Sequence, residues 1–114
     1  MKDCLFCKII AGEIPCEKVY EDENCFAFKD INPQAPVHIL LLPKIHAEAV
    51  HLIPDENDGT ARNLFAAASN IVKEQNLTQD GYRLVINSGK NAGQTVYHLH
   101  IHILGGKQMQ WNPA

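Results

Sequence analysis

Residues 98–103 have the sequence HLHIHI, which holds three of the six histidines of the chain. Its three histidines alternate with aliphatic residues, an apolar pattern of period two that predicts a half-buried β-strand. Successive side chains of a strand point to opposite faces, so the histidines share one face, roughly 6.6 Å apart along the strand. The aliphatic residues then pack into the core on the other face. The histidines are His98, His100 and His102.

Two kinds of chemistry use imidazoles arranged in this way. A His-x-His pair on a strand can chelate zinc, and a hydrolase can use three such ligands with an activated water. Alternatively, one imidazole is a nucleophile or general base, and its neighbours orient it and bind the charge of a substrate. A polar strand face without function is the weakest interpretation, because histidine is not a favoured residue on exposed strands.

Composition narrows the class of protein. The 114 residues predict a single domain, 1–114, that is long enough to bury a core. A hydrophobic content of 46% and a charged content of 20% are typical of soluble globular proteins. The net charge of -3 predicts no surface for polymeric nucleic acid, and no apolar run is long enough to cross a membrane. Four cysteines without a secretion signal predict a cytoplasmic protein without disulfides.

The remaining sequence predicts an α+β fold. The segment 4–15 is expected to contain a short helix that Gly12 ends, with Pro15 beyond it. A longer helix is expected over 60–75. Strands surrounding one long helix favour an antiparallel sheet with the helices on one side. The predicted strands are 18–22, 25–30, 35–43, 82–87 and 96–104.

The longer predicted helix has one apolar face. Asp58 or Thr60 is expected to cap its start, and Gly81 follows its end after a short polar stretch. The residues expected to form the apolar face are Ala61, Leu64, Phe65, Ala68, Ile71 and Val72.

A loop of small and polar residues, SGKNAGQT at 88–95, leads directly into the histidine strand. Gly89 and Gly93 permit positive φ angles and a close approach of the backbone to a ligand. The N–H groups of such a loop can bind a phosphate. Both common phosphate loops, G-x-G-x-x-G and G-x-x-x-x-G-K-[ST], are absent from the sequence, so any phosphate site here is of another kind.

Cys4 and Cys7 form a C-x-x-C motif. On a helix, residues at i and i+3 project to one side, and two thiolates are half of the four ligands of a closed zinc site. The other two cysteines are isolated in the sequence, so histidines must complete any such site. A redox motif is disfavoured because no strand precedes it, and two inert buried thiols are the other alternative.

Several segments resemble the histidine-triad (HIT) superfamily of nucleotide hydrolases and transferases. HLHIHIL matches the superfamily motif His-φ-His-φ-His-φ-φ, in which φ is apolar. LFCKIIAGEIP, NAGQTVYHLHIH, LGGKQMQW and the long segment 20–46 are similar to the Hint branch, the purine nucleoside phosphoramidases. The resemblance implies a five-stranded antiparallel sheet with two helices, which continues across a homodimer.

The resemblance also implies roles for individual residues. His100 corresponds to the nucleophile that attacks the α-phosphorus and forms a nucleotidyl-histidine intermediate. His102 corresponds to the histidine that contacts the phosphate, and its presence favours hydrolysis because transferase members carry glutamine there. His98 is the first histidine of the triad, and His38 supports the triad. The implied ribose and base contacts are Asp30 and Ile31, and the implied phosphate contacts are Asn87, Gly93, Gln94 and Thr95.

Thr95 stands where eukaryotic Hint proteins usually carry a serine that is thought to help the leaving amine. The hydroxyl group is retained, so the same role is expected. In zinc-bearing members of the superfamily, the N-terminal C-x-x-C pairs with a histidine after the P-K turn and with the first triad histidine. The resemblance therefore implies a closed, structural Zn²⁺ site. Its ligands in this chain are Cys4, Cys7, His46 and His98.

The sequence thus predicts an enzyme that hydrolyses purine nucleoside 5′-phosphoramidates, or related nucleotidyl P–N and P–O bonds, and releases AMP or GMP. No cofactor is expected to take part in the chemistry. The expected partners are a purine nucleotide and a second copy of the chain, with no nucleic acid polymer and no membrane. The alternatives are a dinucleoside polyphosphate hydrolase, a zinc hydrolase and a non-enzymatic purine nucleotide sensor.

Overall fold

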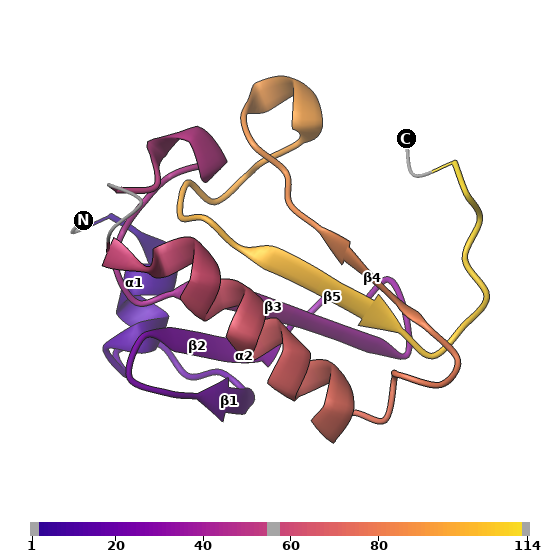
Figure 1. Cartoon of the computed structure of the whole chain (residues 1–114). Coiled ribbons are helices and arrows are strands. Elements are labelled where there is room, and N and C mark those ends of the chain that lie inside the picture. The colour runs from indigo at the N-terminus through magenta and orange to yellow at the C-terminus, as the bar shows by residue number, and fades with distance from the viewer. Residues whose placement is uncertain (1–2, 55–57, 113–114) are drawn as a thin grey trace.

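The computed structural model describes residues 3–54 and 58–112, which form one antiparallel sheet with helices packed against it (Figure 1). Within these residues the sheet has five strands in the order β1-β2-β3-β5-β4, so the predicted five-stranded antiparallel sheet with two helices is confirmed. The strands are β1 (Lys18–Glu21), β2 (Cys25–Lys29), β3 (Val37–Pro43), β4 (Tyr82–Val85) and β5 (Ile101–Gly105). The helices are α1 (Leu5–Ile10) and α2 (Thr60–Glu74), with short 3₁₀ turns η1 (Val50–Leu52) and η3 (Lys90–Ala92).

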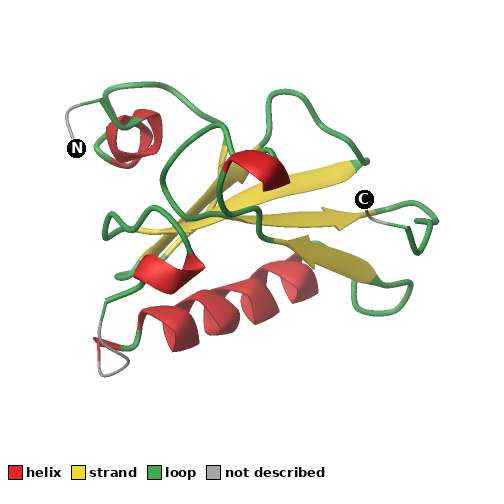
Figure 2. Ribbon diagram, turned by 90° about the horizontal axis from the view of Figure 1, so that it is seen from above, coloured by secondary structure: helices red, strands yellow, loops and turns green. Residues whose placement is uncertain are grey.

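The sheet is covered on both faces, so the expectation of helices on one side is wrong. Alternate residues of β2 and β3 belong to two separate apolar clusters, one with α2 and one with α1. Figure 2 shows the two helices on opposite sides of the sheet. Since the apolar run of β3 buries both of its faces, both need a covering layer. The residues facing α2 are Cys25, Ala27, Ile39 and Leu41, and those facing α1 are Phe26, Phe28, Leu40 and Leu42.

Helix α2 begins with a carboxylate beside its first turn. The Oδ1 atom of Asp58 accepts a hydrogen bond from the N–H of Thr60 at 2.9 Å, while Gly59 occupies the N-cap position. The helix ends at Glu74 with Gln75 at the C-cap position, in agreement with the predicted range 60–75, and Asn76 follows with a left-handed φ of 59°. The N–H of Leu77 then donates to the carbonyl of Val72, so the turn satisfies a carbonyl of the last helical turn.

The buried face of α2 is narrower than the sequence pattern suggested. Ala61 and Phe65 are exposed, and Phe65 keeps 61% of its accessible surface. Both lie at the border of the stripe that packs on the sheet, in the first half of the helix. Within the described residues, no helix is long and apolar enough to span a bilayer. The buried positions of α2 are Thr60, Leu64, Ala67, Ala68, Ile71 and Val72.

Strand β5 begins at Ile101, five residues later than residue 96 where the sequence pattern placed its start. Its pairing with both neighbours starts here: β3 pairs Leu41 with Ile101, and β4 pairs its last residue, Val85, with His102. Before the strand, the N–H of Leu99 donates to the carbonyl of Ala47 at 2.7 Å. The first two histidines of the alternating stretch therefore lie on a bent segment, where the carbonyl of His98 can accept a hydrogen bond from a side chain.

Candidate active site

Four imidazoles gather on the face of the sheet opposite α2. His102 lies on β5, and His38 lies on the neighbouring β3, two register positions away. The ring centroids of His38 and His102 are 5.2 Å apart, and those of His100 and His102 are 5.0 Å apart. Phe6 of α1 packs edge-to-face against His100, with ring centroids 5.0 Å apart, and also contacts His98. Helix α1 thus packs on the histidines at the face of the sheet opposite α2.

Backbone carbonyls determine which nitrogen of two histidines carries the hydrogen. His100 Nδ1 lies 2.7 Å from the carbonyl oxygen of His98, and His98 Nε2 lies 2.8 Å from that of Pro43. A carbonyl can only accept, so both nitrogens donate. In the neutral imidazoles, the lone pair is left on Nε2 of His100 and on Nδ1 of His98.

The tautomers of the other two histidines follow from a backbone amide. The N–H of Gln34 donates to His38 Nδ1 at 2.9 Å, so a neutral His38 carries its hydrogen on Nε2. This Nε2 lies 2.9 Å from His102 Nδ1 and 3.3 Å from Asp30 Oδ2. When His38 donates to His102, the hydrogen of His102 is placed on Nε2. The site then presents a lone pair on His100 beside an N–H donor on His102.

Burial keeps these imidazoles neutral. It lowers the pKa of His100 below the usual value, although the carbonyl of His98 and the charge of Asp30 oppose the shift. Burial also lowers the pKa of His38, against the effect of Asp30. The pKa of His102 falls to about 4, first through burial and then through repulsion from His100 and His38. A neutral imidazole with a free lone pair is the reactive form of a histidine nucleophile.

A cavity of about 310 Å³ lies in front of the histidines. It brings together five residues that the sequence analysis singled out: His100, His102, Asp30, Ile31 and Thr95. This volume is within the range of small-molecule sites, which are largely apolar with a few polar groups. The apolar wall could not be predicted from the sequence, because its residues come from α1, the segment after α1, β2 and β3 and meet only after packing. The wall includes Leu5, Phe6, Ile9, Ile14, Phe28 and Leu40.

Three of the predicted phosphate contacts do not line this cavity. The side chain of Gln94 is buried and bonds to its own surroundings: its Oε1 accepts from the N–H of Gly89, and its Nε2 donates to the carbonyls of Glu48 and Val96. Gln94 therefore holds the loop in shape in this conformation. The other two residues are Asn87, which follows β4, and Gly93, which has the expected positive φ of 81°.

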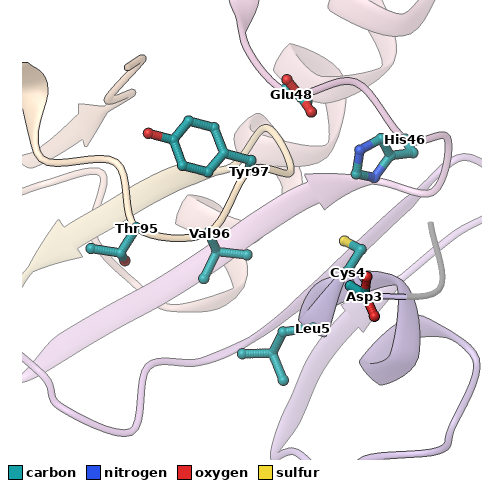
Figure 3. A pocket seen from close by; sticks show the side chains of 8 residues that line it. All are labelled: Asp3, Cys4, Leu5, His46, Glu48, Thr95, Val96 and Tyr97. Atoms are coloured by element: carbon teal, nitrogen blue, oxygen red, sulfur yellow. The ribbon is translucent and has the colours of Figure 1, made fainter. Parts of the chain in front are cut away.

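A second, more open cavity of about 510 Å³ adjoins the first (Figure 3). It lies between the start of α1, the turn after β3 and the segment that leads to β5. Leu5, Thr95 and Val96 line both cavities, so Thr95 stands at the boundary between them. The second cavity is more polar, because Asp3 and Glu48 also line it.

The C-x-x-C motif meets two histidines beside the second cavity. His98 Nδ1 lies 3.4 Å from the sulfur of Cys4 and 3.5 Å from that of Cys7, and Cys7 lies 3.4 Å from His46 Nδ1. All four potential ligand atoms are within 4.8 Å of one another. Ligands of a tetrahedral Cys₂His₂ zinc site are about 3.5 Å apart, given Zn–S of about 2.3 Å and Zn–N of about 2.0 Å.

The chemistry of this cluster also fits a metal ion. His98 directs the unprotonated Nδ1 toward the sulfurs, because its Nε2–H is held by Pro43. Burial raises the pKa of Cys7 to about 11, and the neighbouring Cys4 adds to the shift. A bound cation takes the place of the thiol protons and stabilises the thiolates. Because His98 faces the cysteines, it does not share one metal with His100 and His102, as the zinc-hydrolase alternative requires.

Comparison with known proteins identifies the family. A model of the HIT domain matches residues 11–109. The chain belongs to the HIT family. An uncharacterised HIT-like protein of Synechocystis sp. is 46% identical over 99% of this chain and 98% of that protein.

Solved structures of HIT proteins are similar to this chain over most of its length. A HIT family hydrolase from Legionella pneumophila superposes with a TM-score of 0.93 at 46% identity, covering 98% of this chain and 100% of that one. A histidine triad nucleotide-binding protein from Candida albicans gives a TM-score of 0.84 at 34% identity, covering 98% and 84% of the two chains.

The depressed pKa of His102 predicts a pH dependence of the stability of this HIT protein. Between the unfolded value of 6.5 and the folded value of about 4, the unfolded chain binds a proton at this position and the folded protein does not. The free energy of unfolding should therefore fall as the pH falls through this window. The His102→Gln variant retains polar groups at this position but does not titrate. Its free energy of unfolding should fall by roughly 1–2 kcal/mol less than that of the wild type over this pH range, a difference that partial exposure of His102 keeps small.

Chemical denaturation of both proteins at several pH values from about 7 to about 4.5 measures this difference. Titratable groups that do not interact with His102 affect the two proteins equally and cancel in the comparison. If the free energies of unfolding of the two proteins changed with pH in parallel, His102 would not be held neutral by its surroundings.

Proposed function

We propose that this chain is a single HIT domain of the Hint branch that hydrolyses purine nucleoside 5′-phosphoramidates through a nucleotidyl-histidine intermediate. The main support is that His100, with a free lone pair on Nε2, and His102, whose Nδ1 faces the Nε2–H of His38, line one cavity. Displacement at phosphorus needs a nucleophile beside a group that stabilises the anionic oxygens. The relatives named a hydrolase and a nucleotide-binding protein agree with this activity.

The cavity offers a place for each part of a nucleotide. Its apolar wall suits a purine base, with Ile31 at the rim, where 91% of its surface is exposed. The Asp30 carboxylate accepts hydrogen bonds from the ribose hydroxyls, and the α-phosphate lies at His100 and His102. The remaining phosphate contacts of the proposal are Asn87, Gly93, Gln94 and Thr95. Thr95 lines the cavity, and the other three require the loop before β5 to rearrange when the phosphate binds.

The reaction proceeds in two displacements. His100 Nε2 attacks the α-phosphorus, the P–N bond breaks, and the leaving nitrogen keeps the electron pair. That nitrogen takes up a proton that solvent supplies by way of the exposed Thr95 hydroxyl, and it departs as an amine toward the second cavity. Water then attacks the phosphorus, the bond to Nε2 breaks, and the nucleoside monophosphate leaves with release of the proton. A single donor such as His102 Nε2–H stabilises a transition state of this kind by roughly 3 kcal/mol.

Zinc, when bound to Cys4, Cys7, His46 and His98, supplies a cross-link and takes no part in the displacement. A site with four protein ligands has no open position for water or substrate. The cross-link holds the start of α1 against His98, whose carbonyl orients the nucleophile. The proposed site of action is the cytoplasm, where thiols remain reduced.

We expect His100→Ala to abolish turnover of adenosine 5′-phosphoramidate, by at least about a thousandfold, because the nucleophile is lost. Binding of AMP should remain measurable by calorimetry, since the cavity wall is unchanged. Mass spectrometry of the acid-quenched wild type should detect a protein–AMP adduct that the variant lacks. His51→Ala, at an exposed histidine, is the matched control and should behave as the wild type does. Wild-type turnover by His100→Ala would remove this residue from its role.

The metal site should contribute to stability and not to chemistry. We expect about one zinc per chain by elemental analysis of protein purified without chelator. Replacing Cys4 and Cys7 together by serine should lower the melting temperature clearly, because ligands from separate segments converge only in the folded state. Cys16→Ser, at an exposed cysteine, should leave the melting temperature unchanged.

Activity per folded molecule of the Cys4→Ser, Cys7→Ser protein should fall much less than in His100→Ala. Two results would contradict this assignment. One is protein without metal, and the other is chelation that stops turnover at once while the fold persists.

We also propose a homodimer in which the sheet continues across the β4 edges. Within the described residues β4 pairs only with β5, so its outer edge is open. Exposed apolar residues accompany this edge, with Tyr82 at 45% and Ile86 at 37% exposure. A long open strand edge with apolar side chains favours pairing with another chain.

Sedimentation should therefore give about twice the chain mass of 12.7 kDa at micromolar concentration. Ile86→Lys places like charges close together across a symmetric edge and should shift the protein toward the monomer. Ile45→Lys, at a similarly exposed isoleucine on the turn after β3, should remain dimeric. A wild-type monomer under these conditions would exclude the proposed assembly.

A further inference from the structure

One hydrogen atom in the site has two acceptors. The Nε2 of His38 lies 2.9 Å from Nδ1 of His102 and 3.3 Å from Oδ2 of Asp30. The other ring nitrogen of His38 accepts from the backbone N–H of Gln34, so it has no hydrogen to give. His38 is 7% exposed, and water cannot readily supply a second donor. Asp30 and His102 therefore compete for the same N–H.

The outcome of this competition decides what His102 presents to a ligand. When His38 donates to His102 Nδ1, the hydrogen of His102 is on Nε2. When His38 turns its N–H toward Asp30, the contact with His102 opens, and His102 Nδ1 can then carry the hydrogen itself. The lone pair is then on Nε2, where it repels the oxygens of a phosphate. Only the first arrangement stabilises the displacement.

The ligand can bias the competition through Asp30. Oδ1 of Asp30 accepts from the backbone N–H of Asn32 at 2.8 Å, which fixes the carboxylate on the turn after β2. Oδ2 is the oxygen near His38, and Asp30 also lines the cavity. A hydroxyl group that donates to this carboxylate weakens its hold on His38. The hydrogen of His38 then goes to His102.

We propose that Asp30 is a positioning residue that acts on His102 through His38, and that a vicinal diol on the ligand switches His102 into its phosphate-binding tautomer. This inference rests on the proposed function for the identity of the ligand as a ribonucleotide. Its consequence is that the sugar hydroxyls raise kcat as well as lower KM. The preferred substrates are accordingly ribonucleotides, selected in the chemical step and not only in binding.

A comparison of two substrates tests the coupling. Adenosine 5′-phosphoramidate and its 2′,3′-dideoxy analogue differ only in the hydroxyls that meet Asp30. In the wild type, we expect the dideoxy substrate to lower kcat by about tenfold, which corresponds to about 1.4 kcal/mol. In His38→Phe, which has no donor, the two kcat values should agree to within about twofold while the difference in KM remains.

The controls separate coupling from damage to the fold. His51→Phe makes the same change at an exposed histidine and should retain the tenfold kcat ratio of the wild type. His38→Gln keeps an N–H donor and should restore part of that ratio. A kcat ratio near one in the wild type, or an unchanged ratio in His38→Phe, overturns the coupling while leaving the phosphoramidase function intact.

A second measurement needs neither turnover nor a variant. Nitrogen NMR of ¹⁵N-histidine-labelled protein reports which ring nitrogen of His102 carries the hydrogen. Saturation with AMP should give the Nε2–H form, whereas saturation with 2′,3′-dideoxy-AMP should leave a mixture of the two tautomers. Identical His102 spectra in the two complexes overturn the inference. Absence of turnover with any phosphoramidate would instead overturn the proposed function, and the NMR comparison would still decide the coupling.

Discussion

The site depends on the way His98 is held. Its Nε2–H donates to the carbonyl of Pro43 at the end of β3, which turns Nδ1 toward Cys4 and Cys7. The carbonyl of the same residue accepts the Nδ1–H of His100 and so leaves Nε2 of His100 free. One buried residue therefore connects the N-terminal helix, the central strand and the candidate nucleophile. Because His98 has no exposed surface, water does not compete for these bonds.

The bend before β5 makes this arrangement possible. If His98 and His100 were in a regular ladder, their carbonyls would bond to neighbouring strands. The register ends at Ile101, so the carbonyl of His98 is available for an imidazole. The same bend lets the loop with Gly89 and Gly93 approach the histidines, with Gln94 holding it in shape. An irregular segment beside a rigid sheet is a common place for functional groups.

Burial has two effects on the histidines. It removes them from water, which lowers their pKa and keeps them neutral. It also leaves each ring nitrogen with a protein partner, and these partners select the tautomer. His100 and His102 thus lie with their ring centroids 5.0 Å apart without either ring being charged. Among the described residues, the Asp30 carboxylate opposes the depression of the pKa values of His38, His100 and His102, and it stands where a ligand can reach it.

From the sequence alone, the antiparallel sheet and the approximate positions of its strands could be predicted, and the chemistry was assigned to HLHIHI. Alternation of period two in HLHIHI and the apolar run of β3 are local signals, and the match to the HIT motif depends on residue order alone. The tertiary structure decided which of these residues meet. The covering of both sheet faces, the late start of β5 and the exposure of Phe65 depend on packing between distant segments. The apolar wall of the cavity, the sharing of the His38 hydrogen and the turning of His98 toward the cysteines also required it, because each joins atoms from different strands, helices or turns.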